Sequence, residues 1–325
     1  MTVLVTGGAG YIGSHMVHAL LDRGEDVVVV DDMRTGVRAA LPPDVALVEG
    51  DVADETVLAR AMEGGVDTVL HFAGSTIVPE SVADPLKYYR NNTGATRALL
   101  AAAVERDVPH VVFSSTAAVY GITGAEPVAE DAPTLPIAPY GRSKLMSEWM
   151  LEDASRAHPI RHAILRYFNV AGADPQGRTG QSTPDATHLI KVACQAALGL
   201  RPGMEVFGTD WPTPDGTAQR DFIHVSDLVQ AHLDAMDALR AGGPSATFNC
   251  GYGRGFSVHE VIEAVERHSN RKIALAHAPR RPGDAAVVLA DATRIRRELG
   301  WTPRHDDLDT IVRSALEWER RLGEV

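Results

Sequence analysis

Residues 3–15, VLVTGGAGYIGSH, decide the fold that this sequence predicts. The four glycines Gly7, Gly8, Gly10 and Gly13 follow an apolar run and stand at the start of an amphipathic stretch. Glycines between a strand and a helix allow a tight turn, close approach of the backbone to a pyrophosphate, and close packing of helix on strand. The free N–H groups at the helix start also favour an anion. The stretch therefore predicts a dinucleotide site, with a purely structural glycine turn as the alternative.

A carboxylate at the end of the next apolar run supports the dinucleotide interpretation. The run DVVVVD ends at Asp31, 18 residues after Gly13, where an acidic side chain can hold both hydroxyls of the adenosine ribose. Such a residue repels a 2′-phosphate, so NAD is favoured over NADP, although Arg34 leaves NADP open. Asp51 ends the following run, either as a strand-end turn residue or at the edge of the sheet where ligands bind.

Short apolar runs alternate with helix-like stretches through the first half of the chain. Continuous apolar runs flanked by helices indicate a parallel sheet covered on both faces, the doubly wound α/β fold. After residue 168 long loops rich in Pro, Gly and Asp become frequent. We expect a Rossmann domain at 1–168 and a smaller α/β lobe at 169–325 that binds substrate, with segments such as 246–253 returning to the sheet. The runs are residues 2–6, 26–31, 45–51, 67–74, 110–115 and 161–169.

Composition narrows the classes of function. The 325 residues are 45% hydrophobic and carry a formal net charge of -12, which argues against a nucleic-acid partner. The two cysteines, Cys194 and Cys250, do not indicate a disulfide framework. With neither a signal sequence nor an apolar stretch of transmembrane length, we expect a cytoplasmic protein without a membrane partner. The histidines lack ligand-like clustering, so no metal site is predicted.

The segment PYGRSK places Tyr140 and Lys144 four positions apart, and thus on one face of a helix. An unperturbed Tyr titrates near ~10, and a useful base at neutral pH needs that value lowered by about 2 to 3 units. An ammonium about 5 Å away, at an effective dielectric of about 20, supplies roughly 3 kcal/mol. The pair predicts a phenol whose pKa is lowered by Lys144. A chance pair on an exposed helix is the alternative.

A series of motifs in this order resembles the extended short-chain dehydrogenase/reductases, and within them the UDP-glucose 4-epimerase family. The resemblance covers nearly the whole chain. Its motifs are TGGAGYIGSH (6–15), HFAG (71–74), SSTAAVYG (114–121), YGRSK (140–144), RYFNVAGA (166–173), DGTAQRDFIHVSDL (215–228), NCGYGRGFSV (249–258) and RRPGDAAVVLAD (280–291).

The resemblance implies catalytic and cofactor roles for particular residues. Tyr140 matches the active-site acid and base, Lys144 the residue that lowers its pKa and holds the nicotinamide ribose, and Thr116 a hydroxyl that touches the sugar. Asn91 matches a cofactor-contacting asparagine, with a helix cap as the alternative. Thr76 stands where many relatives carry a Lys, so one charged NAD contact is missing. The full implied NAD set is Gly7, Gly10, Tyr11, Ile12, Gly13, Asp31, Asp51, Val52, Phe72, Ala73, Asn91, Ser114, Tyr140, Lys144 and Tyr167.

The second half matches family positions that hold a UDP-sugar. Arg220 and Arg281 match residues that clamp the pyrophosphate, and guanidinium forks suit phosphate oxygens. Asp284 matches a residue that holds the uridine ribose. Val288 stands where some relatives have a Tyr that bounds the sugar pocket, so we expect N-acetylated sugars to fit as well. The implied substrate set is Thr116, Asn169, His188, Leu189, Phe207, Arg220, Arg281, Asp284 and Val288.

The implied reaction is reversible C4 epimerisation of UDP-hexoses through a 4-keto intermediate, in a homodimer with tightly bound NAD. A 4,6-dehydratase would need an added acid and base after the Thr, and this chain has Ala117 and Ala118 there. Another NAD-dependent UDP-sugar 4-epimerase, acting on N-acetylhexosamine, glucuronate or pentose, stays open. A non-catalytic dinucleotide sensor is the remaining alternative.

Overall fold

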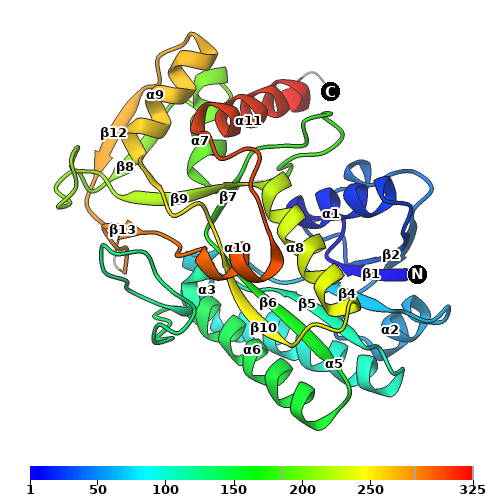
Figure 1. Ribbon diagram of the computed structural model, residues 1–325. Coiled ribbons are helices and arrows are strands. Elements are labelled where there is room, and N and C mark those ends of the chain that lie inside the picture. The colour runs from blue at the N-terminus through cyan, green and yellow to red at the C-terminus, as the bar shows by residue number, and fades with distance from the viewer. Residues whose placement is uncertain (184–185, 282, 324–325) are drawn as a thin grey trace.

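A parallel sheet of seven strands forms the centre of the part of the chain that the computed structural model describes, residues 1–183, 186–281 and 283–323 (Figure 1). The order β10-β6-β5-β4-β1-β2-β3 contains the 3-2-1-4-5-6 arrangement of dinucleotide-binding sheets, which confirms the predicted doubly wound α/β fold. The strands are β1 (Thr2–Thr6), β2 (Asp26–Asp31), β3 (Ala46–Glu49), β4 (Thr68–His71), β5 (His110–Ser114), β6 (Arg161–Tyr167) and β10 (Ala246–Cys250).

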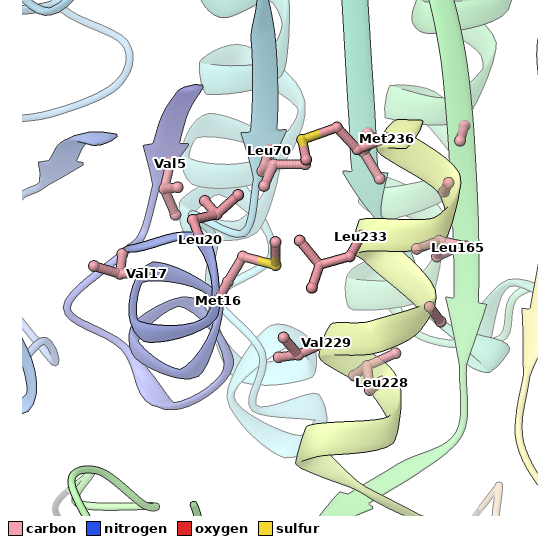
Figure 2. Packing of buried hydrophobic residues seen from close by; sticks show 14 of the residues in the cluster. Val5, Met16, Val17, Leu20, Leu70, Leu165, Leu228, Val229, Leu233 and Met236 are labelled. Carbon is pink, nitrogen blue, oxygen red and sulfur yellow. The ribbon is translucent and has the colours of Figure 1, made fainter. Parts of the chain in front are cut away.

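Helices cover both faces of this sheet, as its continuous apolar strands require. Successive side chains of a strand point to opposite faces, so Val3 and Val5 join one core and Leu4 joins the other. Figure 2 shows the first core, where Met16 lies opposite Leu233 between the sheet and two helices. Its helices are α1 (Tyr11–Asp22), α8 (Val225–Arg240) and α10 (Thr293–Leu299); the other face carries α2 (Glu55–Ala61), α5 (Ala95–Glu105) and α6 (Pro139–Ala157).

Short helices fill the connections near the carboxyl edge of the sheet. A π-helical turn, η2 (Tyr89–Gly94), leads directly into α5, and such turns are frequent at functional sites. The other short helices are α3 (Val78–Ala83), α4 (Pro85–Tyr88), η1 (Arg38–Ala40) and η3 (Ala117–Val119).

The rest of the chain forms a smaller lobe with its own core. Three helices pack on one another there, α7 (Leu189–Leu198), α9 (Val258–Ser269) and α11 (Leu308–Gly323). β10 pairs in parallel with β6, so this strand of the second half lies in the first sheet. The lobe's strands are β7 (Asn169–Ala171), β8 (Met204–Phe207), β9 (Gln219–His224), β11 (Gly255–Ser257), β12 (Leu275–Ala278) and β13 (Val287–Val288).

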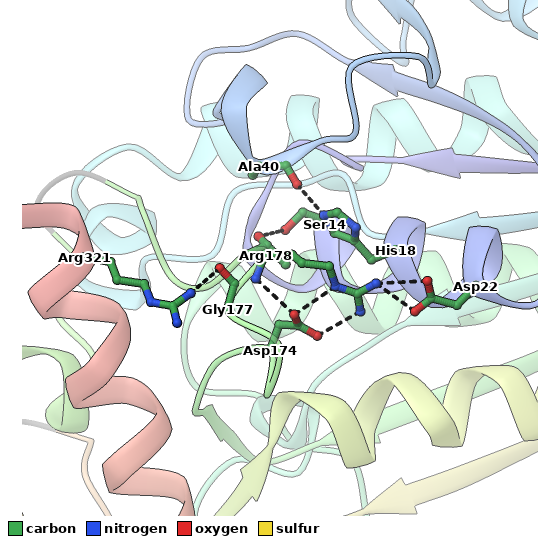
Figure 3. Close-up of polar contacts among 9 residues, drawn as sticks. Ser14, His18, Asp22, Ala40, Asp174, Gly177, Arg178 and Arg321 are labelled. Atoms are coloured by element: carbon green, nitrogen blue, oxygen red, sulfur yellow. Dashed lines mark hydrogen bonds and ion pairs between the residues drawn. The ribbon is translucent and has the colours of Figure 1, made fainter. Parts of the chain in front are cut away.

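The loop that follows β7 fastens the first helix to the last one (Figure 3). Arg178 donates to both carboxylate oxygens of Asp22 on α1, at 2.9 and 2.8 Å, and its Nε lies 2.9 Å from Asp174 within the loop. On the other side Arg321 of α11 donates to the Gly177 carbonyl at 2.7 Å. One loop therefore holds elements of both lobes.

The described residues also bear on membrane and metal-dependent functions. None of the helices there combines the length and apolarity that crossing a bilayer requires. Groups of three or more His, Cys, Asp or Glu side chains placed to hold a metal are also absent from those residues.

Candidate active site

The glycine turn after β1 leaves a concave stretch of bare backbone, the glycine cradle (residues 7–13), in which a side chain at a glycine position would collide with neighbouring atoms. Gly7 adopts φ +69°, and a Cβ there would lie 2.6 Å from the amide nitrogen of Ala73. A Cβ at Gly13 would lie 2.1 Å from the Gly7 carbonyl oxygen. The first N–H groups of α1, at Tyr11, Ile12 and Gly13, are those that a helix leaves without internal partners. A bare backbone at a helix start fits a pyrophosphate.

Asp31 at the end of β2 is joined to this cradle. Its carboxylate accepts the amides of Ala9 and Met33, each at 2.9 Å. Burial raises the pKa of Asp31, and the two amide hydrogen bonds offset part of that shift. The carboxylate lies beside the turn, as the proposed role toward the adenosine ribose requires.

The guanidinium of Arg34 pairs with carboxylates of the protein itself. Its Nε lies 2.7 Å from Asp32, and Nη2 lies 3.9 Å from Asp51. Asp31, Asp32 and Asp51 therefore form a cluster of three carboxylates at the ends of β2 and β3, to which a 2′-phosphate would add further negative charge. This cluster favours NAD over NADP.

Other residues predicted to contact the cofactor lie along the same edge, at or just after the carboxyl ends of successive strands. Ligands of open α/β sheets bind outside these ends. They comprise Asp51 and Val52 after β3, Phe72 and Ala73 after β4, Ser114 at the end of β5 and Tyr167 at the end of β6.

Two neighbouring asparagines on the π-helical turn behave differently. The side chain of Asn91 donates to the Ser75 hydroxyl at 3.0 Å. Asn92, which the sequence did not single out, is buried and joins the backbone of Ser75 to the Ser143 hydroxyl of α6, at 2.7 and 2.9 Å. The π-helical turn shifts the helix face by one position, and apolar periodicity does not reveal such a shift. The cofactor contact of Asn91 stays a prediction. Asn92 is the residue that links the segment after β4 to α6.

Tyr140 stands at the start of α6, and Thr116 is the polar neighbour of its hydroxyl. Thr116 caps η3, where its Oγ1 accepts the Ala118 amide at 3.2 Å. The ring of Tyr88 meets that of Tyr140 edge-on, with centroids 6.3 Å apart. Burial raises the pKa of Tyr140, and the neighbouring Thr116 hydroxyl offsets part of the shift.

Lys144 lies one turn further along α6 and is buried, with 3% of its surface exposed. Its ammonium donates to the Ser114 carbonyl at 2.9 Å and lies 4.8 Å from the centroid of the Phe113 ring. Burial lowers the pKa of Lys144 to about 8, while the charge of Glu148 raises it. The predicted lowering of the Tyr140 pKa is wrong for the protein groups alone, because burial outweighs the stabilisation of the phenolate.

Lys144 costs stability as long as it is charged. Its pKa in the folded protein, about 8, lies below the ordinary 10.5, so the unfolded chain binds the proton more tightly. The cost is present in full below pH 8 and disappears as pH rises toward 10.5. We expect Lys144→Met to raise the free energy of unfolding at pH 7 by about 2 kcal/mol, which is the roughly 3 kcal/mol cost of the buried charge less about 1 kcal/mol for the lost hydrogen bond to Ser114. Urea unfolding of both proteins at several pH values measures this difference, and a gain that does not shrink with rising pH contradicts it.

The second half brings part of the predicted substrate set together. Arg220 and Val288 are paired in the β9–β13 ladder, and Arg220 Nη2 lies 4.0 Å from Asp284. Arg281 stacks on the ring of Phe207, with its guanidinium carbon 3.6 Å from the centroid. Within the described residues no ion pair joins Arg281 to a carboxylate, so its charge is available to an anion.

The other three predicted substrate residues line one cleft between β7, α7 and α11. They are Asn169, His188 and Leu189. The side chain of His188 is hydrogen-bonded to Gln181, with Nδ1 2.7 Å from Nε2. A buried ion pair of Lys191 and Glu319 closes one side of the cleft.

Several buried polar groups behind the site were missed by the sequence analysis. His232 of α8 is hydrogen-bonded to the Ser114 hydroxyl at 2.8 Å, and Arg166 of β6 pairs with Glu148 of α6. Glu148 could have been found, because it follows Lys144 by four positions and so continues the face of Tyr140 and Lys144. The partners His232 and Arg166 come from distant segments, and no local pattern connects them to the site.

A dinucleotide cradle beside a Tyr, Lys and Thr constellation defines a class of nucleotide-dependent enzymes. In agreement, residues 3–251 match the NAD-dependent epimerase/dehydratase family, and the chain belongs to that family. NAD is therefore the cofactor, and the bare glycine turn, Asp31 and the carboxylates around Arg34 fit it.

Individual relatives narrow the class to the UDP-glucose 4-epimerases, as the sequence motifs predicted. The UDP-glucose 4-epimerase of Azospirillum brasilense is 60% identical over 321 residues, which are 98% of this chain and 92% of that protein. A crystal structure of UDP-glucose 4-epimerase from Bifidobacterium longum in complex with NAD+ and UDP is 38% identical, with a TM-score of 0.93 and coverage of 99% and 98% of the two chains. The enzyme from Stenotrophomonas maltophila with bound NAD and formylated UDP-arabinopyranose is 41% identical, with a TM-score of 0.95 and coverage of 100% and 99%.

Proposed function

We propose that this protein interconverts UDP-galactose and UDP-glucose by epimerisation at C4 of the sugar. The observation that carries the proposal is that Tyr140 and the buried Lys144 lie one turn apart on α6, with Thr116 beside Tyr140, at the same sheet edge as the glycine cradle. The chemistry that NAD supplies when bound is reversible acceptance of a hydride from C4.

The residues of the chain have separate tasks in this reaction. The Tyr140 oxygen takes the proton of the C4 hydroxyl and later gives it back, and the Thr116 hydroxyl orients the sugar oxygen through hydrogen bonding. Burial opposes the phenolate of Tyr140, so the base step needs two positive charges: the ammonium of Lys144, held by the Ser114 carbonyl, and the charge that oxidised NAD would supply when bound. Arg220, Arg281 and the cleft at Asn169 anchor the UDP moiety while the sugar turns over, so binding energy far from C4 retains the intermediate.

The segment after Thr116 favours epimerisation over dehydration. Ala117 and Ala118 begin η3, and methyl groups cannot transfer the protons that elimination of water requires. A UDP-sugar 4-epimerase of another specificity is the second candidate, favoured by the small side chain of Val288 beside Arg220.

The test is to incubate the purified protein with UDP-galactose, without added NAD, and follow the anomeric proton signals by NMR. Formation of UDP-glucose up to a constant ratio supports the proposal, including the retained cofactor. UDP-N-acetylgalactosamine and a UDP-pentose in parallel samples rank the sugars. Failure to convert UDP-galactose, even after NAD is supplied, would refute the proposed substrate.

Arg281 should contribute strongly to UDP binding. Its charge-assisted hydrogen bonds to phosphate are worth about 1.5 to 3 kcal/mol, so we expect Arg281→Ala to weaken UDP binding by roughly 10- to 100-fold in calorimetry. Arg280→Ala is the matched control, because Arg280 also stacks on an aromatic ring, Trp211 at 4.1 Å, but already pairs with Asp210. Equal losses in the two variants would contradict the role of Arg281.

We propose a homodimer in the cytoplasm as the form in which the enzyme acts. Large apolar side chains are exposed on neighbouring helices, with Val82 66% and Leu86 76% exposed on α3 and α4, and Trp149 53% exposed on α6. Burial of such side chains favours association of two copies. The free thiols of Cys194 and Cys250 suit a reducing compartment. Sedimentation of the purified protein tests the dimer.

A further inference from the structure

The face of α6 that carries Tyr140 and Lys144 continues one turn further to a buried carboxylate. Glu148, 1% exposed, is clamped by Arg166 of β6, whose Nη2 lies 2.6 Å from Oε2 and whose Nε lies 3.1 Å from Oε1. The Ser115 hydroxyl also donates to Glu148. A buried ion pair that is also hydrogen-bonded in this way fixes the parts of the fold it joins.

The segment that Glu148 holds is the one that places the reacting groups. Ser115 lies between Ser114, whose carbonyl accepts the Lys144 ammonium, and Thr116, whose hydroxyl meets Tyr140. The hydrogen bond of Ser115 to Glu148 therefore locks the end of β5 against α6 between the two contacts.

We propose that Glu148 is a positioning residue of the reaction, which holds the segment 114–116 against Tyr140 and Lys144 and sets the charge balance around the Lys144 ammonium. The inference rests on the proposed function. Glu148 acts through these groups without touching the reacting atoms.

The charge balance follows from the groups that face Lys144 among the described residues. Tyr140 and Glu148 lie on its own helix, and His71 faces it from β4; burial and the charge of Lys144 lower the pKa of His71 to about 3. Glu148 is therefore the anionic group that opposes the burial of Lys144, and Arg166 lies behind it on β6. If Glu148 is made neutral, the positive charge of Arg166 remains and Lys144 loses its proton more easily.

The first measurement is an NMR titration of 13C-labelled lysine. The chain has four lysines, Lys87, Lys144, Lys191 and Lys272, and Lys144→Arg assigns the signal of Lys144 by its disappearance. We expect Glu148→Gln to lower the titration midpoint of Lys144 by about one pH unit. The double variant Glu148→Gln/Arg166→Gln removes both charges and should move the midpoint back toward the wild-type value.

Activity is followed in the same variants. We expect Glu148→Gln to reduce kcat roughly tenfold with little change in KM, and the alkaline limb of the kcat profile to move to lower pH with the midpoint of Lys144. Glu25→Gln is the control, since it breaks the pair of Glu25 with Arg240, whose nitrogen lies 2.6 Å away, at the opposite edge of the sheet. It should lower stability without moving the Lys144 midpoint.

Ser115→Ala tests the positioning of segment 114–116 while leaving the charge of Glu148 unchanged. It remains informative if Glu148→Gln does not fold. It removes one hydrogen bond and leaves the ion pair, so we expect kcat to fall while the Lys144 midpoint stays. An unchanged kcat in Ser115→Ala, or an unchanged Lys144 midpoint in folded Glu148→Gln, overturns the proposal. A wild-type protein that does not epimerise would refute the proposed function instead, and the titration would still decide the role of Glu148.

Discussion

Tyr140→Phe should lower the rate of UDP-galactose conversion roughly a thousandfold, which is within the usual range for loss of a general acid and base. The substitution removes only the hydroxyl, and the phenyl ring still packs edge-on against Tyr88 at the observed 6.3 Å. The ring is retained, so we expect the fold to persist. The NMR assay with UDP-galactose measures the rate.

Tyr252→Phe is the matched control for this prediction. Its hydroxyl is also largely enclosed, donating to Asp227 at 2.7 Å and accepting the His224 amide at 2.9 Å. We expect this variant to be less stable, because a carboxylate and an amide lose a partner, but to keep its rate within a fewfold of wild type. A similar loss of rate in both variants would show that the rate depends on removing a buried tyrosine hydroxyl in general. It would contradict proton transfer by Tyr140 in particular.

Gly13→Ala should abolish retention of NAD. The added Cβ would lie 2.1 Å from the Gly7 carbonyl oxygen and 2.8 Å from the Gly8 Cα, and both contacts are with backbone. The turn must open to relieve them, at a cost of about 3 kcal/mol, which corresponds to roughly a hundredfold in affinity. The NAD released when the purified protein is denatured, measured per chain, gives the retained fraction.

Gly64→Ala controls for the loss of a glycine as such. A Cβ at Gly64 meets no atom within 4 Å. We expect this variant to retain NAD as the wild type does and to have nearly the same stability. If Gly13→Ala also retained NAD, the cradle assigned to residues 7–13 would be wrong.

The fold could be predicted because its signals are local. The continuous apolar runs at residues 2–6 and 26–31 can only be buried on two faces, and the glycines between strand and helix fix the turn. The long loops after residue 171 were visible from their Pro and Gly content for the same reason, since these residues disfavour regular structure.

The site could be predicted only in part, because its electrostatics depend on distant segments. The spacing of Tyr140 and Lys144 predicts a shared helix face, and both lie on α6. Their burial is set by the packing of α6 against η2, η3, α3 and α4, which no pattern within residues 139–150 contains. The spacing of the two residues reveals the attraction between ammonium and phenolate but not the desolvation of both groups, and desolvation decides the direction of both pKa shifts.

The loop after β7 bears on how long the cofactor stays. Arg178 of this loop pairs with Asp22 of α1. The Gly172 carbonyl accepts a hydrogen bond from the Tyr11 hydroxyl at 2.7 Å, and the Thr179 and Ser14 hydroxyls are hydrogen-bonded to each other, also at 2.7 Å. Tyr11 and Ser14 belong to the first turns of α1, the helix whose start we predict to bind the pyrophosphate. An epimerase returns its cofactor to the starting redox state in every cycle, so nothing in the reaction requires exchange. We expect the loop to give NAD a residence time much longer than that of the sugar nucleotide, which would make the dinucleotide a permanent component of the enzyme.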